Sequence, residues 1–407
     1  MKKDLPLSGY KVIELATVVA APTAGRLLAE FGAEVIKIEP PSGDPLREIG
    51  EMHMLPIDAG NNPMFDTFNV GKELTSINLK SPEGYNILKE MLGSADVFLT
   101  NTRMQSLEKL GLDYETLKEK FPSLIYAHFS GFGLTGPDKD RPGYDTTAFW
   151  MRTGAVLDWI PEPDFPVRAS YAFGDIASAS YFLNGILIAL LAREKSGHGT
   201  LVSTSLFNSG IWMNSTSVVN AQPQYGRVYP NGRYDPWNLF SDYYRCSDGV
   251  WISPISKNYR NDRPMLAKLF NMPELVEDPD CEDVGRMREA GKLEGCIRHL
   301  ASAIESKSSE EWINLFSEYD LPYETVGSVQ TLYKDEQAWA NGYFEKVNYP
   351  DGCETVIPVP PIVLTEYNRR SFVPQGALGA DTERVLASMG YSEDEITKLR
   401  DSNIIIG

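Results

Sequence analysis

A single carboxylate, Asp175, stands directly after Gly174 near the start of a strongly apolar stretch that predicts a buried helix. Asp is a preferred residue at helix N-termini, so one interpretation of Asp175 is a structural helix cap. The position also suits a nucleophile, because the helix dipole and unpaired backbone N–H groups favour an ionised carboxylate. The preceding glycine leaves room for a reactant. From its position alone, Asp175 fits either role.

A glycine-rich run from Gly131 to Gly136 matches the G-x-G-x-x-G pattern and follows a predicted strand. In dinucleotide-binding proteins a helix opens on the third glycine of this pattern. Here Pro137 and Pro142 bracket the residues that follow, and a helix does not accommodate them. The run therefore predicts no NAD site. It is expected to be a flexible loop, with closure over a substrate as the functional alternative.

The histidines and cysteines predict no metal site. The four histidines are scattered, and the four cysteines lack C-x-x-C spacing: Cys246, Cys281, Cys296 and Cys353. His128 and His198 have no evident partner in the sequence, so structural roles are expected for both. So few cysteines in 407 residues indicate reduced thiols and a cytoplasmic protein.

Short β-branched runs alternate with helical patterns along the first part of the chain. Strands are expected at residues 11–15, 34–39, 76–79, 96–99, 124–129 and 201–205, and helices at 23–31, from Ser81, at 114–121 and at 178–193. This alternation predicts an α/β fold with a doubly wound, mostly parallel, Rossmann-like sheet. Such sheets bind ligands at the carboxyl ends of their strands, and the small residues of the first turn, Ala16 to Pro22, permit close approach.

Three segments are expected: a large Rossmann-like domain over residues 1–220, a linker with a small α+β domain over 221–335, and a C-terminal segment over 336–407 that returns to the large domain. The tail predicts two short helices that turn at Gly390. The net charge of −18 argues against nucleic-acid partners and against docking on an anionic membrane. The longest apolar run, residues 186–192, is far shorter than a membrane span.

Nearly end to end, the chain resembles the class III, or CaiB/BaiF, CoA-transferases, the family that includes formyl-CoA:oxalate CoA-transferase. The matching motifs are VIEL from Val12, AP at Ala21, GAEVIKIE from Gly32, ADVFLTN from Ala95, GFGLTGP from Gly131, PGYD from Pro142, Gly174-Asp175 and ERVL from Glu383. The resemblance implies an intertwined homodimer that uses acyl-CoA as a co-substrate and needs no metal.

The resemblance assigns the nucleophile to Asp175. Its carboxylate would attack the thioester to give an aspartyl–acyl anhydride, which CoA thiolate converts to an aspartyl-CoA thioester. An acceptor carboxylate then takes the CoA. The resemblance also implies CoA contacts at Val18, Val19, Ala20, Ile77, Lys80, Asn101, Thr102 and Lys109. It implies substrate contacts at Tyr144, Asp145 and Trp237.

Departures from formyl-CoA transferase disfavour oxalate and formyl substrates. That enzyme has Gln where Val19 stands and a glycine-rich run where this chain has the segment from Gly232 to Trp237. The likeness is closer to the subgroup that acts on 2-hydroxyacyl- and enoyl-CoA. That subgroup, however, carries His where this chain has Ile176.

Two other functions are possible on this fold. A 2-methylacyl-CoA racemase on the same fold carries His where this chain has Tyr144, and a phenol with a pKa of about 10 is a poor base at neutral pH. A non-catalytic CoA-binding protein would need no carboxylate at Asp175. Both alternatives are therefore less favoured than CoA transfer to a carboxylic acid.

Overall fold

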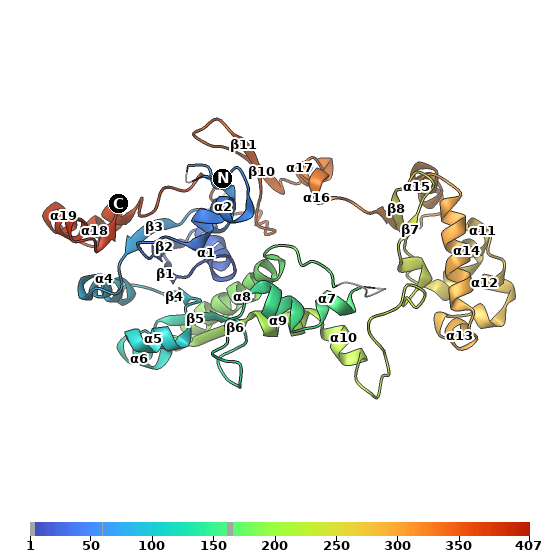
Figure 1. Cartoon of the computed structure of the whole chain (residues 1–407), viewed down its shortest axis with the longest axis horizontal. Coiled ribbons are helices and arrows are strands. Elements are labelled where there is room, and N and C mark those ends of the chain that lie inside the picture. Colours follow the sequence, from blue (N-terminus) through green and yellow to red (C-terminus); the bar gives the residue numbers. More distant parts are fainter. Residues whose placement is uncertain (1–4, 59, 161–165) are drawn as a thin grey trace. The chain divides into compact units, whose positions relative to one another are not determined.

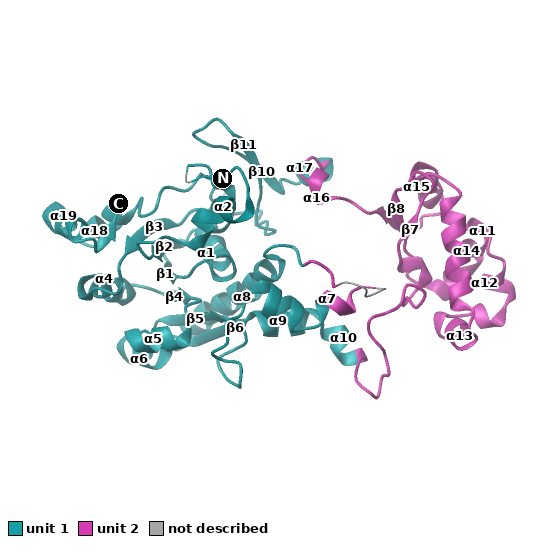
Figure 2. Ribbon diagram, in the orientation of Figure 1, with its two compact units in different colours: residues 1–155, 169–219, 336–407 teal, residues 156–168, 220–335 magenta. Residues whose placement is uncertain are grey.

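The computed structural model describes residues 5–58, 60–160 and 166–407. The chain forms two compact units (Figure 2). The first comprises Met1–Ala155, Ala169–Val219 and Glu336–Gly407, and the second comprises Val156–Arg168 and Asn220–Asp335. The short segment 156–168 of the second unit has no counterpart in the division expected from sequence.

The first unit is built around a seven-stranded sheet in the order β12-β3-β2-β1-β4-β5-β6. Figure 1 labels its strands β1 to β6. The strands are β1 Lys11–Leu15, β2 Glu34–Glu39, β3 Glu73–Ile77, β4 Val97–Thr100, β5 Ile125–Ser130, β6 Leu201–Ser205 and β12 Ile405–Ile406. All neighbours pair in parallel except β12, which is antiparallel to β3. The predicted α/β class with a mainly parallel sheet is confirmed. The two-residue β12 was not expected, and β3 begins earlier than predicted.

Helices cover both faces of this sheet, which explains why most residues of β1 to β5 are buried. One core cluster joins the sheet to α4 Pro82–Gly93, α5 Met104–Leu110, α6 Tyr114–Lys120, α18 Thr382–Ser388 and α19 Glu393–Asp401. On α1 Ala20–Glu30 and α8 Phe173–Ser196, apolar residues pack helix against helix, and α8 also contacts β5 and β6. The expected helix from Ser81 is present, because Ser81 Oγ accepts the Gly84 N–H at 2.9 Å and Pro82 occupies the first turn.

The first unit has further elements at its edges. They are η1 Pro45–Glu48, α2 Ile49–His53, α3 Pro63–Asn69, the π-helix η2 Asp145–Met151, α9 Leu206–Met213, α10 Ser215–Asn220, α17 Glu336–Ala340 and the hairpin of β10 Phe344–Asn348 with β11 Glu354–Pro358. The helix α7 Ala155–Asp158 and the last residue of α10 cross the unit boundary. The predicted C-terminal helix pair is confirmed, with Gly390 at φ 99° between α18 and α19.

The second unit has its own core and a three-stranded antiparallel sheet. Its elements are η3 Leu239–Ser241, β7 Tyr244–Arg245, β8 Trp251–Pro254, α11 Tyr259–Leu269, α12 Glu274–Glu277, η4 Pro279–Cys281, α13 Val284–Glu289, α14 Leu293–Glu305, α15 Ser309–Glu318, β9 Tyr323–Thr325 and α16 Val329–Leu332. The buried Trp312 anchors this core, and its indole N–H donates to the Ile304 carbonyl at 2.8 Å.

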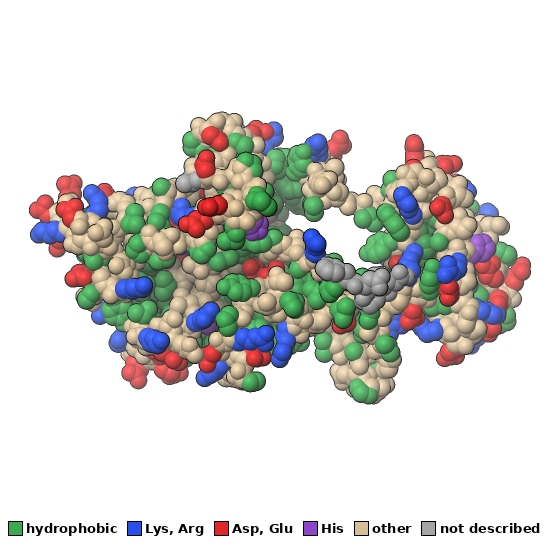
Figure 3. Space-filling view, viewed as in Figure 1, with side chains coloured by type: hydrophobic (Ala, Val, Ile, Leu, Met, Phe, Trp, Pro, Cys, Tyr) green, Lys and Arg blue, Asp and Glu red, His purple; other side chains and the backbone are tan. Residues whose placement is uncertain are grey.

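The 24-residue helix α8 is long and apolar enough to cross a membrane by length and composition alone. In the structure it packs on α1, α9, β5 and β6, as a core helix does. Part of its apolar surface is nevertheless exposed, including Ile188 and Leu191. Figure 3 shows acidic and basic side chains interspersed over the visible face of the protein.

Candidate active site

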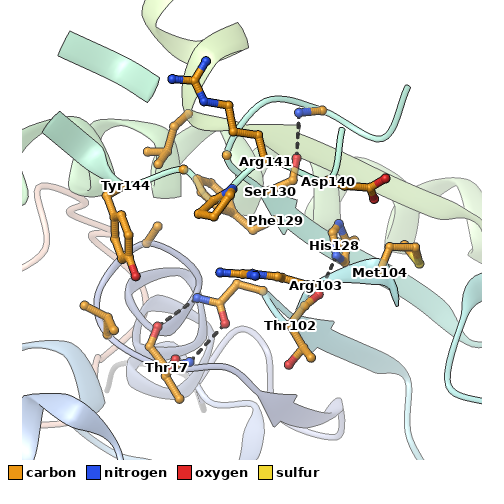
Figure 4. A pocket seen from close by; sticks show the side chains of 18 of the residues that line it. Thr17, Thr102, Arg103, Met104, His128, Phe129, Ser130, Asp140, Arg141 and Tyr144 are labelled. Atoms are coloured by element: carbon orange, nitrogen blue, oxygen red, sulfur yellow. Dashed lines mark hydrogen bonds between the residues drawn. The ribbon is translucent and has the colours of Figure 1, made fainter. Parts of the chain in front are cut away.

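A cavity of about 770 Å³ lies at the carboxyl edge of the sheet, where the strand order reverses between β1 and β4. Ligands bind at this kind of switch point in doubly wound sheets. Residues after β1, β4 and β5 line the cavity, together with the first turn of α8. Figure 4 shows Thr17, Thr102 and Arg103 on one side, with Asp140, Arg141 and Tyr144 opposite them. All lining residues belong to the first unit.

Most of the residues singled out from the sequence meet in this cavity. They are Val18, Val19, Ala20, Asn101, Thr102, Tyr144, Asp145 and Asp175. The structure does not bring the other candidates in the first unit to it. Ile77 is fully buried in the core beside the sheet, and the exposed Lys80 and Lys109 do not line the cavity. Trp237 belongs to the second unit.

The cations of the cavity are residues that sequence reasoning missed. Arg103, Lys139 and Arg141 line it, and Arg141 lies 5.2 Å from the centre of the Phe132 ring. Arg103 directly follows Thr102 at the carboxyl end of β4, which is the signal that could have identified it. Lys139 and Arg141 lie in the glycine-rich loop, where charge alone does not reveal which side chains face a ligand.

The two ends of the glycine-rich loop, at Gly131 and Gly143, lie in contact. A Cβ on Gly131 would lie 2.6 Å from the Gly143 Cα, a separation that real side chains do not adopt. Glycine at both positions therefore allows the two backbones to touch, and residues 132–142 form the loop between them. No helix follows Gly136, in agreement with the rejection of a dinucleotide fingerprint.

Asp175 lies inside the first turn of α8 and is not its cap. The helix begins at Phe173, five residues before the predicted start at 178, and its N-cap is Ala172, whose φ is 60°. No side chain caps this end. The helix-cap interpretation of Asp175 is therefore wrong. Glycine disfavours a helix by propensity, so the sequence around Gly174 gives little sign of the early start.

Tight packing joins Asp145 to the first turn of α8. A Cβ on Gly174 would lie 2.2 Å from Asp145 Oδ1 and 2.4 Å from Phe149 Cγ. Only glycine fits at this position, so the glycine before Asp175 is a consequence of contact with the π-helix η2. Asp145 is 8% exposed, while Asp175 is partly accessible from the cavity.

Burial governs the ionisation of both carboxyls. Burial, and after it the charge of the neighbouring Asp145, raise the pKa of Asp175 from its ordinary value to about 7. Burial likewise raises the pKa of Asp145 to about 6, although the backbone N–H of Gly174 and the Trp150 side chain oppose the rise. The helix N-terminus was expected to keep Asp175 ionised, but burial and a like-charged neighbour outweigh it.

His128 also lines the cavity. Its Nε2 lies 2.9 Å from the Thr102 carbonyl oxygen, so Nε2 carries the proton and donates it. Burial lowers the pKa of His128, which keeps the ring neutral at physiological pH. His128 was expected to be structural, and the structure also places it in the cavity wall.

The site thus combines a protonatable carboxyl pair, three cations and space for a large ligand. Cavities of this size accept ligands well above the size of a simple acid. Within residues 5–58, 60–160 and 166–407, no three His, Cys, Asp or Glu side chains are grouped so as to hold a metal ion. The lining side chains of the cavity support chemistry by a carboxylate in cationic surroundings.

Comparisons with known proteins agree with this arrangement. The sequence model of CoA-transferase family III matches residues 7–382. The (R)-2-hydroxy-4-methylpentanoate CoA-transferase of Clostridioides difficile is 36% identical over 399 residues, covering 98% of this chain and 99% of that protein. The cinnamoyl-CoA:phenyllactate CoA-transferase of Clostridium sporogenes is 36% identical over 403 residues, covering 98% of this chain and 97% of that protein.

A solved structure shares the fold. A CAIB/BAIF family protein from Brucella suis has a TM-score of 0.78 at 26% identity, covering 95% of this chain and 100% of that one. The resemblance read from the motifs is confirmed. The chain belongs to CoA-transferase family III and is an enzyme that transfers CoA from an acyl-CoA to a carboxylic acid.

Proposed function

We propose that Asp175 is the nucleophile of the transfer. Its carboxylate attacks the carbonyl carbon of the acyl-CoA thioester, and the C–S bond breaks to give an aspartyl–acyl anhydride and CoA thiolate. The thiolate then attacks the aspartyl carbonyl and releases the first acid as its carboxylate. The acceptor carboxylate attacks the resulting aspartyl-CoA thioester, and CoA thiolate finally attacks the acyl carbon of the second anhydride, which restores Asp175.

The observation that carries this proposal is the position of Asp175, which lines a cavity large enough for an extended ligand without capping its helix. A carboxylate is a weak nucleophile towards a thioester. Orientation of two bound reactants can supply about 7–11 kcal/mol of the barrier. Remote binding energy from the CoA nucleotide supplies more. A large binding site beside one small reactive group is what this chemistry requires.

CoA brings phosphate groups to a chain with a net charge of −18, so local cations must bind them. Arg103, Lys139 and Arg141 are the cations that line the cavity in the described part of the chain. We assign the CoA phosphates to these three residues, and we expect further CoA contacts at Val19 and Ala20, which also line the cavity. The earlier assignment to Lys80 and Lys109 is less favoured, since neither reaches the cavity wall.

The acceptor is proposed to be a 2-hydroxy acid or an enoate with a branched or aromatic side chain. The names of the two relatives at 36% identity support this class. Val19 and the exposed aromatic ring of Tyr144 line the cavity where an oxalate site would need charged partners. Efficient use of oxalate would contradict this choice.

The enzyme is proposed to act as a cytoplasmic homodimer. Apolar side chains on three consecutive helices of the first unit are exposed in the single chain: Ile188, Leu191, Ile211, Trp212, Met213, Val218 and Val219. Exposed apolar side chains that gather into one patch are typical of a protein interface, and this is the surface that we propose the second copy covers. A monomer at micromolar concentration in sedimentation experiments would count against the dimer.

The Asp175→Asn variant tests the mechanism. An amide has nearly the same shape, so the protein should fold, but it cannot form the anhydride or the thioester, and transfer should fall by several orders of magnitude. Hydroxylamine added during turnover should modify Asp175 only when acyl-CoA is present. The Asp66→Asn variant, which alters a buried carboxyl outside the cavity, is the matched control. Near-normal transfer by Asp175→Asn would overturn the assignment.

A further inference from the structure

The turn between β1 and α1 holds a valine in an unfavourable backbone conformation. Val18 has a φ of 67°, in the left-handed region that β-branched residues rarely adopt. Val18 also lines the cavity, as do the next two residues, Val19 and Ala20. Residues in such conformations persist only where their surroundings hold them. The contacts around Val18 therefore impose this conformation.

Asp44 supplies the contact to Val18. The Val18 N–H donates to both carboxylate oxygens, at 3.1 Å to Oδ1 and 3.2 Å to Oδ2. Asp44 is 1% exposed, and its Oδ1 also accepts the Leu46 N–H at 3.0 Å. A buried carboxylate bound on several sides has little freedom to move, so the Val18 amide is held in one direction.

Lys37 fixes Asp44 in turn. Its Nζ lies 2.9 Å from Asp44 Oδ2 and 3.2 Å from Glu14 Oε1, and all three side chains are fully buried. Burial alone would lower the pKa of Lys37, but the Asp44 and Glu14 charges outweigh it and raise the pKa. Lys37 also donates to the Ala16 carbonyl at 2.7 Å, two residues before Val18. The Lys37 amine thus binds both the Ala16 carbonyl after β1 and the Asp44 carboxylate that accepts the Val18 N–H.

The residue before Val18 is held from the opposite side. The Thr17 N–H donates to Asn101 Oδ1 at 3.1 Å, and the Asn101 side-chain amide donates back to the Thr17 carbonyl at 2.8 Å. Asn101 therefore fixes Thr17, whereas Asp44 fixes Val18. If the Asp44 contact were lost, Val18 would relax to a common conformation, and the start of α1 at the cavity wall would shift.

We propose that Asp44, held by Lys37, is a positioning residue for the acyl-CoA site, because it forces Val18 into the left-handed conformation that shapes the cavity wall. Asp44 itself is not a lining residue of the cavity and acts through the Val18 backbone. The inference rests on the proposed function in reading this cavity as the acyl-CoA site. The same contacts would fix the turn whatever ligand the cavity takes.

Substitution at three positions separates positioning from general stability. The Asp44→Asn variant removes the charge that pairs with Lys37 and weakens the hydrogen bond from the Val18 N–H. We expect KM for acyl-CoA to rise about 5- to 30-fold, the range that release of one strained residue can account for. The same change in a Val18→Gly background should have a much smaller effect, because glycine adopts a φ of 67° without steric cost. The Val19→Gly background is the matched control, since Val19 has a φ of −120°.

The comparison is a double-mutant cycle. The inference would be overturned if Asp44→Asn raised KM for acyl-CoA by the same factor in the native and Val18→Gly backgrounds. It would also be overturned if Val19→Gly reduced the effect of Asp44→Asn as much as Val18→Gly does. If Asp44→Asn does not fold, Val18→Gly and not Val19→Gly should restore folded protein; failure in both backgrounds would contradict the positioning role.

A second readout does not depend on turnover. Hydrogen exchange at the Val18 amide should be faster in folded Asp44→Asn than in the native protein, and unchanged exchange would refute the inference. Inactivity of the native enzyme with every acyl-CoA and acid tested would instead count against the proposed function, while the exchange measurement would still report on the turn.

Discussion

The proximity of Asp145 to Asp175 predicts that CoA transfer is lost as pH falls. It also predicts that the charge of Asp145 makes this loss larger. With a pKa of about 7, Asp175 is ionised in about one molecule in ten at pH 6. Only the ionised form attacks a thioester, so native kcat/KM should rise about tenfold between pH 6 and pH 8. The Asp145→Asn variant removes the like charge but leaves the burial of Asp175 in place.

The size of the expected change follows from the order of the two causes. Burial contributes more than the Asp145 charge to the raised pKa of Asp175, so the variant should lower this pKa without restoring its ordinary value. The ratio of kcat/KM at pH 6 to that at pH 8 should therefore increase by between about twofold and tenfold. The ratio is the useful quantity, since it cancels any pH-independent loss caused by the substitution.

The assay is steady-state CoA transfer, with acyl-CoA varied at a saturating concentration of acceptor acid. Asp66→Asn is the control, because Asp66 is another buried carboxyl with a raised pKa that lies outside the cavity, and its substitution should leave the ratio unchanged. An Asp145→Asn ratio equal to the native one would refute the electrostatic coupling. A native rate independent of pH from 6 to 8 would refute the assignment of Asp175 as the titrating nucleophile.

Three further predictions concern binding, packing and stability. Arg103→Ala should raise KM for acyl-CoA about tenfold or more with little change in KM for the acid, whereas Lys109→Ala should change neither, as steady-state kinetics will show. Gly174→Ala should cost about 1–3 kcal/mol in urea unfolding because its Cβ would meet Asp145 and Phe149, whereas Gly295→Ala, which has open space, should not destabilise. Burial raises the pKa of Asp66 from 3.8 to about 6, so the folded state binds this proton more tightly and native stability should fall as pH rises through that interval. Asp66→Asn lacks this titration, so its free energy of unfolding relative to that of the native protein should rise by up to ~3 kcal/mol as pH rises over the same interval. A difference in unfolding free energy that does not change with pH would contradict the effect.

The sequence was informative where a residue's role depends on local pattern. The β-branched runs predict six of the strands because β-branched side chains favour strands over helices. Ser81 and Pro82 predict the start of α4 for the same local reason. The cavity residues Val18, Asn101 and Thr102 were identified because they follow strands in the motifs of a known family.

Features that depend on contacts between distant segments were not predicted. Position 174 requires glycine because Asp145 and Phe149 leave no room for a side chain, and neither is near it in sequence. Arg103 and Lys109 are both cations on or beside α5, and only the folded helix decides which one reaches the cavity. The left-handed Val18 could not be foreseen, since it results from a carboxylate brought there by Lys37 of the neighbouring strand.

The pairing of β12 with β3 has a consequence for how the protein is made. During translation β3 emerges early, whereas Ile405 and Ile406 emerge only after the whole second unit. The second unit's core, from Leu239 to Leu321, can therefore fold while the edge of β3 still has unpaired backbone groups. Such an open edge invites pairing with other nascent chains. A chain truncated before Ile405 would keep this edge open permanently, and aggregation is then the expected fate even though every residue of the cavity is present.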